Sequence, residues 1–160
     1  GLVTSLPLYV SMVLPWIRRS IFSRFGILRK NEILSFTSKM IKRFSIQATD
    51  PEVKTGTLSG GNLQKVLLAR ELAFEPEVLL ASQPTRGLDV AAAEFVHRQF
   101  LSLREKGAAI ILISEDLEEL FALSDRIVVM YEGRIAGETK INDASVEDIG
   151  LLMAGATVGA

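Results

Sequence analysis

The sequence contains no cysteine and only one histidine among its 160 residues. Without cysteine the chain can form neither disulfides nor thiolate metal sites, and it has no thiol nucleophile. A single imidazole argues against a histidine-rich metal site and against a mechanism that needs several histidines. The formal net charge is −1, so no general electrostatic field favours nucleic acid, and we expect no nucleic-acid partner.

A long hydrophobic run is also missing. The most apolar stretch, residues 2–17, contains Pro7 and Pro15 and is shorter than the roughly 20 residues that a bilayer-spanning helix needs. We therefore expect no transmembrane segment and interpret this stretch as a helix that is either buried or faces a partner protein. The first residues carry no positive charge, so no secretory signal is expected.

The pattern of apolar residues predicts an α/β fold. Periodic spacing predicts helices over residues 31–44, 62–74, 90–106 and 117–123. Short apolar runs predict strands at residues 78–81, 108–113, 126–131 and 134–137. The first two strands read as buried on both faces, and Glu132-Gly133 between the last two predicts a hairpin. Alternating strands and helices favour a parallel sheet with right-handed crossovers. A short helical tail follows, with Asp143 or Ser145 as its N-cap.

The segment Leu58-Ser59-Gly60-Gly61-Asn62 precedes a predicted helix that includes Gln64. A helix N-terminus presents unpaired N–H groups and a partial positive charge. Two glycines allow a phosphate to approach the backbone closely, and Ser59 supplies a hydroxyl. A serine cap without any ligand fits the segment equally well.

Three further motifs follow in order: Ser82-Gln83-Pro84-Thr85, then Gly87-Leu88-Asp89, then Ser114-Glu115-Asp116. With the segment at Leu58, this order resembles the ATP-binding-cassette (ABC) family of transporter ATPases over roughly residues 1–137. The segment from Leu58 to Gln64 is similar to the signature motif of that family. The three later motifs resemble, in turn, the end of the Walker B strand, the D-loop and the switch region. The Gly-Gly-Asn signature and the run from Gln83 to Asp89 look most like the second cassette of tandem importers for sugars or nucleosides.

The resemblance implies a partial P-loop NTPase fold of the ABC type. A helical subdomain would precede a mostly parallel sheet flanked by helices and a C-terminal β-hairpin. It also implies three segments: a permease-facing helical subdomain (1–57), the signature helix with a remnant of the ATPase core (58–140), and a C-terminal helical tail (141–160).

The resemblance also implies roles for individual residues. Two cassettes of the family sandwich ATP, so Leu58 to Asn62 and Gln64 are expected to contact ATP held by the Walker A loop of a partner cassette. Gly87, Leu88 and Asp89 are expected to bridge the two halves, and Asp89 also fits the N-cap of the following helix. ATP and Mg²⁺ would be the cofactors of the complete assembly.

The sequence departs from the family pattern in ways that remove chemistry. A phosphate cradle of the form G-x-x-x-x-G-K-[ST] does not occur in it. Ser82 and Gln83 stand where the family has an aspartate for Mg²⁺ and a glutamate that acts as general base, and Glu115 replaces the switch histidine. Serine is a weaker Mg²⁺ ligand than a carboxylate, and glutamine cannot accept a proton. We therefore expect no metal site and no catalytic residue, and a chain that alone does not hydrolyse ATP.

The expected function is that of a nucleotide-binding subunit fragment of an ABC importer for sugars or nucleosides. It would lie peripherally on the cytoplasmic face of the cell membrane, with permease subunits and a Walker A-bearing cassette as partners. An N-terminally truncated but active ATPase, with Glu115 or another carboxylate standing in for the base, is the alternative. A DNA-repair ABC protein fits poorly, because residues 1–57 show no sustained heptads of a coiled coil.

Overall fold

The computed structural model describes residues 1–156; the end of the expected tail, residues 157–160, lies outside this range. The chain forms two compact units. Unit 1 consists of residues Gly1–Glu77 and Thr85–Ala108, and unit 2 consists of Val78–Pro84 and the chain from Ala109 onward. The three functional segments expected from the sequence (1–57, 58–140 and 141–160) divide the chain differently from these two units. They remain a prediction.

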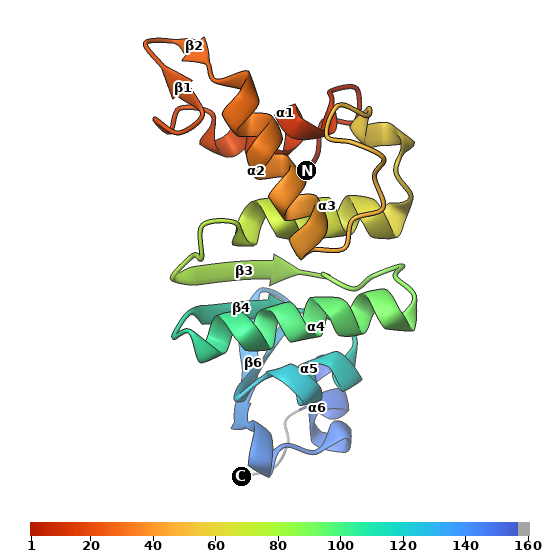
Figure 1. Cartoon of the computed structure of the whole chain (residues 1–160). Helices are drawn as coiled ribbons and strands as arrows, with labels where there is room; N and C mark the ends of the chain where they lie inside the picture. Colours follow the sequence, from red (N-terminus) through yellow and green to blue (C-terminus); the bar gives the residue numbers. More distant parts are fainter. Residues whose placement is uncertain (157–160) are drawn as a thin grey trace. The chain divides into compact units, whose positions relative to one another are not determined.

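Unit 1 is mainly helical (Figure 1). Its elements are helices α1 (Leu8–Val13), α2 (Lys30–Arg43), α3 (Gly60–Leu72) and α4 (Val90–Glu105), the short strands β1 (Ser23–Arg24) and β2 (Ile27–Leu28), and the 3-10 turns η1 (Leu14–Trp16) and η2 (Thr55–Thr57). Helix α1 packs against α2 and α3, and α3 also contacts α4. Helices α2, α3 and α4 confirm the predicted helices at 31–44, 62–74 and 90–106, with each end within two residues of its predicted position. The hairpin β1–β2 was not expected.

The first apolar stretch belongs to the core of unit 1. Leu8, Met12 and Val13 of α1 are fully buried, so this part of the stretch fills the interior, whereas Val3 and Leu14 are exposed. Within residues 1–156, no helix has the length and apolar character needed to cross a membrane.

An aromatic cluster joins the base of the β1–β2 hairpin to the helices. Phe22 lies edge-on to Phe36 of α2, with ring centroids 5.0 Å apart, and Phe36 stacks on Phe74 at 5.8 Å. Trp16 meets Phe74 edge-on at 5.1 Å. The guanidinium of Arg19 covers Phe74 at 3.9 Å from the ring centroid. Edge-on and stacked rings with cation–π contacts add to the burial energy of this cluster.

The loop that leads into α3 is tied to the first residues of the chain. Thr55 donates to the carbonyl of Leu6 through both its backbone N–H and its Oγ1, each at 2.9 Å. The N–H of Gly56 donates to the Thr4 carbonyl at 2.9 Å. Gly56 comes so close that an added Cβ would lie 3.0 Å from that oxygen. These bonds fix the start of α3 within unit 1.

Unit 2 contains a parallel pair of strands and an antiparallel hairpin. Its elements are β3 (Val78–Ser82), β4 (Ala109–Ile113), α5 (Leu117–Leu123), β5 (Arg126–Tyr131), β6 (Arg134–Lys140), the 3-10 turn η3 (Ile141–Asp143) and α6 (Val146–Met153). Strands β3 and β4 pair in parallel from Val78↔Ala109 to Ser82↔Ile113. Strands β5 and β6 form the expected C-terminal hairpin, with positive φ at both Glu132 and Gly133. Helix α6 packs on this hairpin.

Two expectations for unit 2 need correction. Strands β3 and β4 are not buried on both faces, because Leu80 is 65% exposed and Val78, Ile111 and Ile113 are also exposed. A strand is buried on both faces only when another layer packs against each face of its sheet. In the described residues β3 and β4 form a sheet of only two strands, and part of its surface stays open. Strand β5, the third of the expected alternation, pairs with β6 in a separate sheet. The N-cap of the tail helix α6 is Ser145, whose hydroxyl accepts from the N–H of Asp148 at 3.0 Å.

An exposed ion pair joins the end of α4 to the turn after α3. Lys106 donates from Nζ to the carboxylate of Glu75. This hydrogen bond, and then the charge of Lys106, lower the pKa of Glu75 from its ordinary value of 4.5. A carboxyl group whose pKa is lowered by folding stabilises the fold above its ordinary pKa, and this contribution disappears as the pH falls through the lower folded-state value.

We expect Glu75→Gln to reduce the acid sensitivity of unit 1. In wild type the urea concentration at the unfolding midpoint should decrease as the pH is lowered from neutral to well below 4.5. In the variant this decrease should be smaller. The difference should be small and should shrink with added salt, because the pair is solvent-exposed. Glu77→Gln, at an exposed neighbouring carboxylate, is the control. An equal fall in wild type and Glu75→Gln would contradict the assignment.

Candidate functional site

The start of α3 is not capped by its own serine. Ser59 occupies the N-cap position with an extended backbone, yet its side chain makes no capping hydrogen bond. Its carbonyl accepts the first helical bond, from Leu63 N–H at 2.9 Å. Ser59 is therefore the N-cap residue by position, as expected, but its hydroxyl does not cap the helix. The first-turn N–H groups lack a side-chain cap from Ser59 and retain their affinity for an acceptor.

Gly60 and Gly61 leave open space beside these N–H groups. An added Cβ at either position would meet no heavy atom within 4 Å, and neither residue has a positive φ. Neither backbone conformation nor packing inside the chain therefore requires glycine here, in contrast to Gly56. Bare backbone at an uncapped helix start is the arrangement that lets a phosphate come close to N–H donors. This geometry is compatible with a phosphate group at the start of α3.

Asn62 links Ser59 to the preceding loop. Its Oδ1 accepts from the backbone N–H of Gln47 at 2.8 Å, and its Nδ2 donates to Ser59 Oγ at 2.9 Å. The serine hydroxyl therefore accepts one bond within the chain and keeps its proton for another acceptor. Leu58 and Gln64, the other expected signature residues, are half-buried.

The segment resembling the D-loop forms a tight turn before α4. Gly87 has φ 75°, a conformation that glycine adopts without steric cost, and Leu88 N–H donates to the Thr85 carbonyl at 3.0 Å. Asp89 accepts from Ala92 N–H at 2.8 Å through Oδ1. Its expected role as an N-cap is confirmed. Its role as a bridge between two cassettes remains a prediction.

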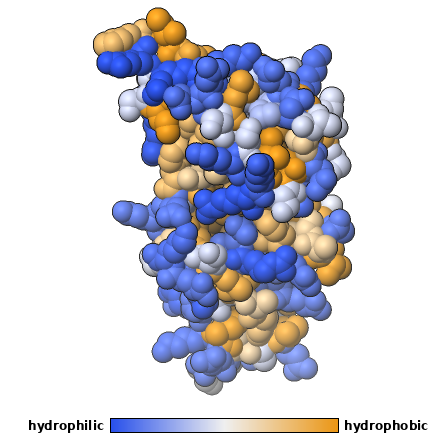
Figure 2. All heavy atoms as spheres, in the orientation of Figure 1, coloured by the Kyte–Doolittle hydropathy of each residue, from blue (hydrophilic) through white to orange (hydrophobic). Residues whose placement is uncertain are grey.

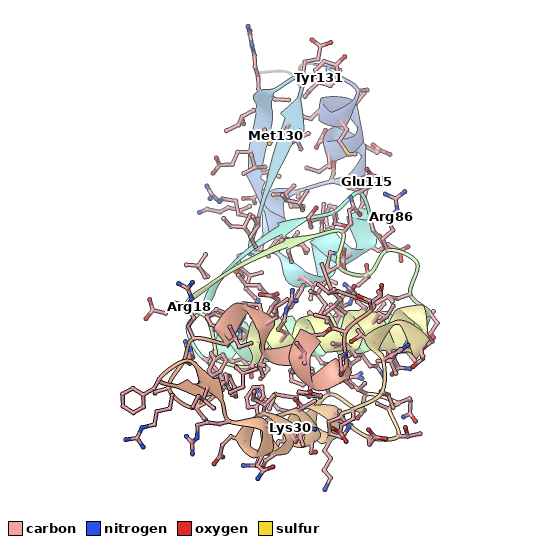
Figure 3. All side chains as sticks on the ribbon, turned by 90° about the horizontal axis from the view of Figure 1, so that it is seen from above. Arg18, Lys30, Arg86, Glu115, Met130 and Tyr131 are labelled. Atoms are coloured by element: carbon pink, nitrogen blue, oxygen red, sulfur yellow. The ribbon has the colours of Figure 1, made fainter. Side chains whose placement is uncertain are left out.

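The positions resembling Walker B and the switch lie at the carboxyl ends of neighbouring parallel strands. Ser82 pairs with Ile113 at the end of the β3–β4 ladder. Gln83 donates its N–H to the Ile113 carbonyl at 2.8 Å and has a positive φ of 49°. Glu115 follows the end of β4 and is exposed (Figure 3). Sites in parallel α/β sheets form at such carboxyl ends, and unit 2 brings these three positions to one end of β3 and β4.

The chemistry of these side chains does not fit a bound Mg²⁺. They supply a hydroxyl, a carboxamide and one carboxylate, whereas hard divalent cations prefer several carboxylate oxygens. Among residues 1–156, no group of three or more histidine, aspartate or glutamate side chains could hold a metal ion. Gln83 also offers no proton acceptor for a general base.

Comparison with known proteins connects this geometry to a fold. No family model matches the chain. It is 40% identical over 157 residues to a guanosine import ATP-binding protein of Bacillus subtilis, covering 98% of the chain and 31% of that protein. Over 147 residues it is 43% identical to a glucose import ATP-binding protein of Haloferax volcanii, covering 86% and 27%. A ribose import ATP-binding protein of Bacillus subtilis is 38% identical over 155 residues, covering 97% and 31%. The chain thus spans about a third of the length of these relatives.

Solved structures of ATP-binding cassettes also match the chain. An ATP-binding cassette in a dimeric post-hydrolysis state with ADP and Pi matches with a TM-score of 0.71 and 25% identity, covering 88% of the chain and 59% of that cassette. A nucleotide-free cassette matches with a TM-score of 0.65 and 21% identity, covering 94% and 60%; it shows the fold alone. The chain therefore has the fold of part of an ABC ATPase cassette, and its relatives are ATP-binding proteins of nucleoside and sugar importers.

Proposed function

We propose that the chain supplies the signature helix of an ABC importer to ATP that another cassette holds. The observation that carries this proposal is the uncapped start of α3, with open space at Gly60 and Gly61. The relatives import guanosine, glucose and ribose, so a nucleoside or a sugar is the proposed class of solute. We place the chain in the second cassette of a tandem importer protein, in the part that lacks Walker A.

The residues of α3 would act by electrostatics and geometry. Backbone N–H groups at Gly60 and Gly61 would donate to oxygens of the γ-phosphate, and the helix dipole would favour its negative charge. The Ser59 hydroxyl, oriented by Asn62, would add a further donor. ATP would supply the phosphoryl group, bound through the Walker A loop of the partner.

The other positions would complete the assembly without catalysing hydrolysis. Ser82 and Gln83 would leave the chain's own site without a metal ligand or base, and the charge of Glu115 would repel a γ-phosphate there. Asp89 would contact the partner cassette. Residues 1–57 would receive the permease and hold the chain peripherally at the cytoplasmic face of the membrane.

The test combines the chain with a cassette that carries an intact Walker A loop. We expect no ATP hydrolysis by the chain alone and measurable hydrolysis by the mixture above that of the partner alone, in a phosphate-release assay. Glu115→Gln should leave the activity of the mixture unchanged. If the chain were instead a truncated active ATPase with Glu115 as its base, the chain alone would show activity that Glu115→Gln abolishes.

A further inference from the structure

The tip of the β1–β2 hairpin presents apolar side chains to solvent. Phe25 is 92% exposed and Ile27 is 74% exposed, and Ile21 and Leu28 beside them are exposed as well. Figure 2 shows apolar residues at this tip next to strongly hydrophilic ones. Exposed clusters of large apolar residues on a folded protein mark surfaces that meet a partner or a membrane.

The same segment is strongly basic. Residues 18–30 contain five basic residues and no acidic residue: Arg18, Arg19, Arg24, Arg29 and Lys30. Three of the five are engaged within unit 1: Arg29 pairs with Glu32 at 2.9 Å, Lys30 pairs with Glu52 at 2.8 Å, and Arg19 covers Phe74. The other two, Arg18 and Arg24, are exposed, and Arg24 lies 5.4 Å from the ring centroid of Phe25. The exposed ring of Phe25 therefore has a basic side chain, Arg24, directly beside it.

The tip is anchored to the rest of unit 1. The carbonyl of Phe22 accepts from Arg29 N–H at 2.9 Å across the hairpin, and Ser23 N–H donates to the Arg19 carbonyl at 3.0 Å. Phe22 itself is fully buried in the aromatic cluster. A partner that meets the tip therefore meets a largely ordered structure, which lowers the entropy cost of binding.

We propose that this tip inserts into the interface of an anionic lipid bilayer, with Phe25 and Ile27 among the headgroups and Arg24 against lipid phosphates. Charge complementarity favours this occupant. An acidic protein surface would also attract Arg24, but it would need a pocket for the projecting ring of Phe25, which is 92% exposed. A bilayer accepts an apolar projection without a preformed pocket. The inference goes beyond the proposed function and does not depend on nucleotide binding.

Co-sedimentation of the whole chain with phosphatidylcholine vesicles, with and without phosphatidylglycerol, tests the proposal. We expect binding to the anionic vesicles that weakens with added salt. Phe25→Ser and Arg24→Glu should each weaken binding about tenfold. Matched controls come from the β5–β6 hairpin, where Ile135 is also exposed: Ile135→Ser and Arg134→Glu should bind as wild type does.

Three outcomes would overturn the proposal. One is equal binding to neutral and anionic vesicles, and another is an equal loss in the Ile135→Ser and Arg134→Glu controls. The third is absence of vesicle binding together with self-association, detected by light scattering, that Phe25→Ser removes; the tip would then be an interface between copies of this chain. Unchanged Trp16 fluorescence in each variant shows that the aromatic cluster remains folded.

Discussion

Phe22→Ala is expected to lower the free energy of unfolding of unit 1 by about 3–5 kcal/mol, the usual cost of removing a buried phenyl ring. Phe22 is fully buried and contacts Phe36 and Phe74 edge-on, at 5.0 and 6.2 Å between ring centroids. The truncation loses the transfer energy of the ring, leaves a cavity and removes both aromatic contacts. A loss of this size is a large fraction of the stability of an ordinary domain.

Urea unfolding followed by Trp16 fluorescence measures this effect. Trp16 is the only tryptophan in the sequence and lies in the same cluster, so its emission reports on the site of the change. Phe25→Ala is the matched control, because it removes the same ring from a position that is 92% exposed. This control should change the unfolding free energy by less than about 0.5 kcal/mol. Equal losses in the two variants would refute the assignment of Phe22 as the anchor of the hairpin.

Ser59→Arg is expected to reduce ATP hydrolysis by the mixture of chain and partner cassette about a hundredfold or more. Removing a single preorganised donor to a developing oxyanion costs about 10²–10³ in rate. This variant removes the hydroxyl and also fills the open space beside Gly60 and Gly61, so that the phosphate can no longer approach the N–H groups. Steady-state phosphate release at saturating ATP measures the effect.

Two variants separate a local effect from general damage. Ser102→Arg makes the same substitution at an exposed serine of α4 and should keep wild-type activity. Ser59→Thr keeps a hydroxyl and should retain most of the activity. Wild-type hydrolysis in Ser59→Arg would rule out the proposed role of the signature helix.

Much of the fold could be predicted because its helices carry strong local signals. Apolar residues of α4 recur with a helical period, and Gly107 after it has the positive φ of a C-terminal cap. The pair Glu132-Gly133 predicted the turn of the β5–β6 hairpin, because both residues must adopt positive φ there. Asp89 was correctly predicted as an N-cap from its place before an apolar periodic run.

The rest depended on tertiary structure. The β1–β2 hairpin turns at Phe25 and Gly26, both with positive φ, and a phenylalanine at such a position is uncommon. The apolar runs of β3 and β4 predicted strands correctly, but sequence alone did not show how many layers would cover them. The alternation of exposed Val78 and Leu80 with less exposed neighbours is a property of the two-stranded sheet.

The candidate site, like the fold, could be predicted from the sequence only in part. The Ser-Gly-Gly run predicted a helix start that could meet phosphate, and the structure adds the open space around the glycines. No sequence signal indicated that Ser59 Oγ would accept a bond from Asn62 instead of capping the helix. That contact requires the loop at Gln47, which lies 15 residues before Asn62.

The bridge at Asn62 has a consequence for hydrogen exchange. A backbone N–H can only donate, so Gln47 N–H must face Oδ1 of Asn62, and this orientation places Nδ2 toward Ser59. A phosphate that accepts the proton of Ser59 polarises this chain of hydrogen bonds. It thereby strengthens the bond from Asn62 to Ser59 and the bond from Gln47 to Asn62. The amide of Gln47 should therefore exchange with deuterium more slowly when a phosphate occupies the start of α3. One backbone amide, outside the helix, would thus report on the state of the site.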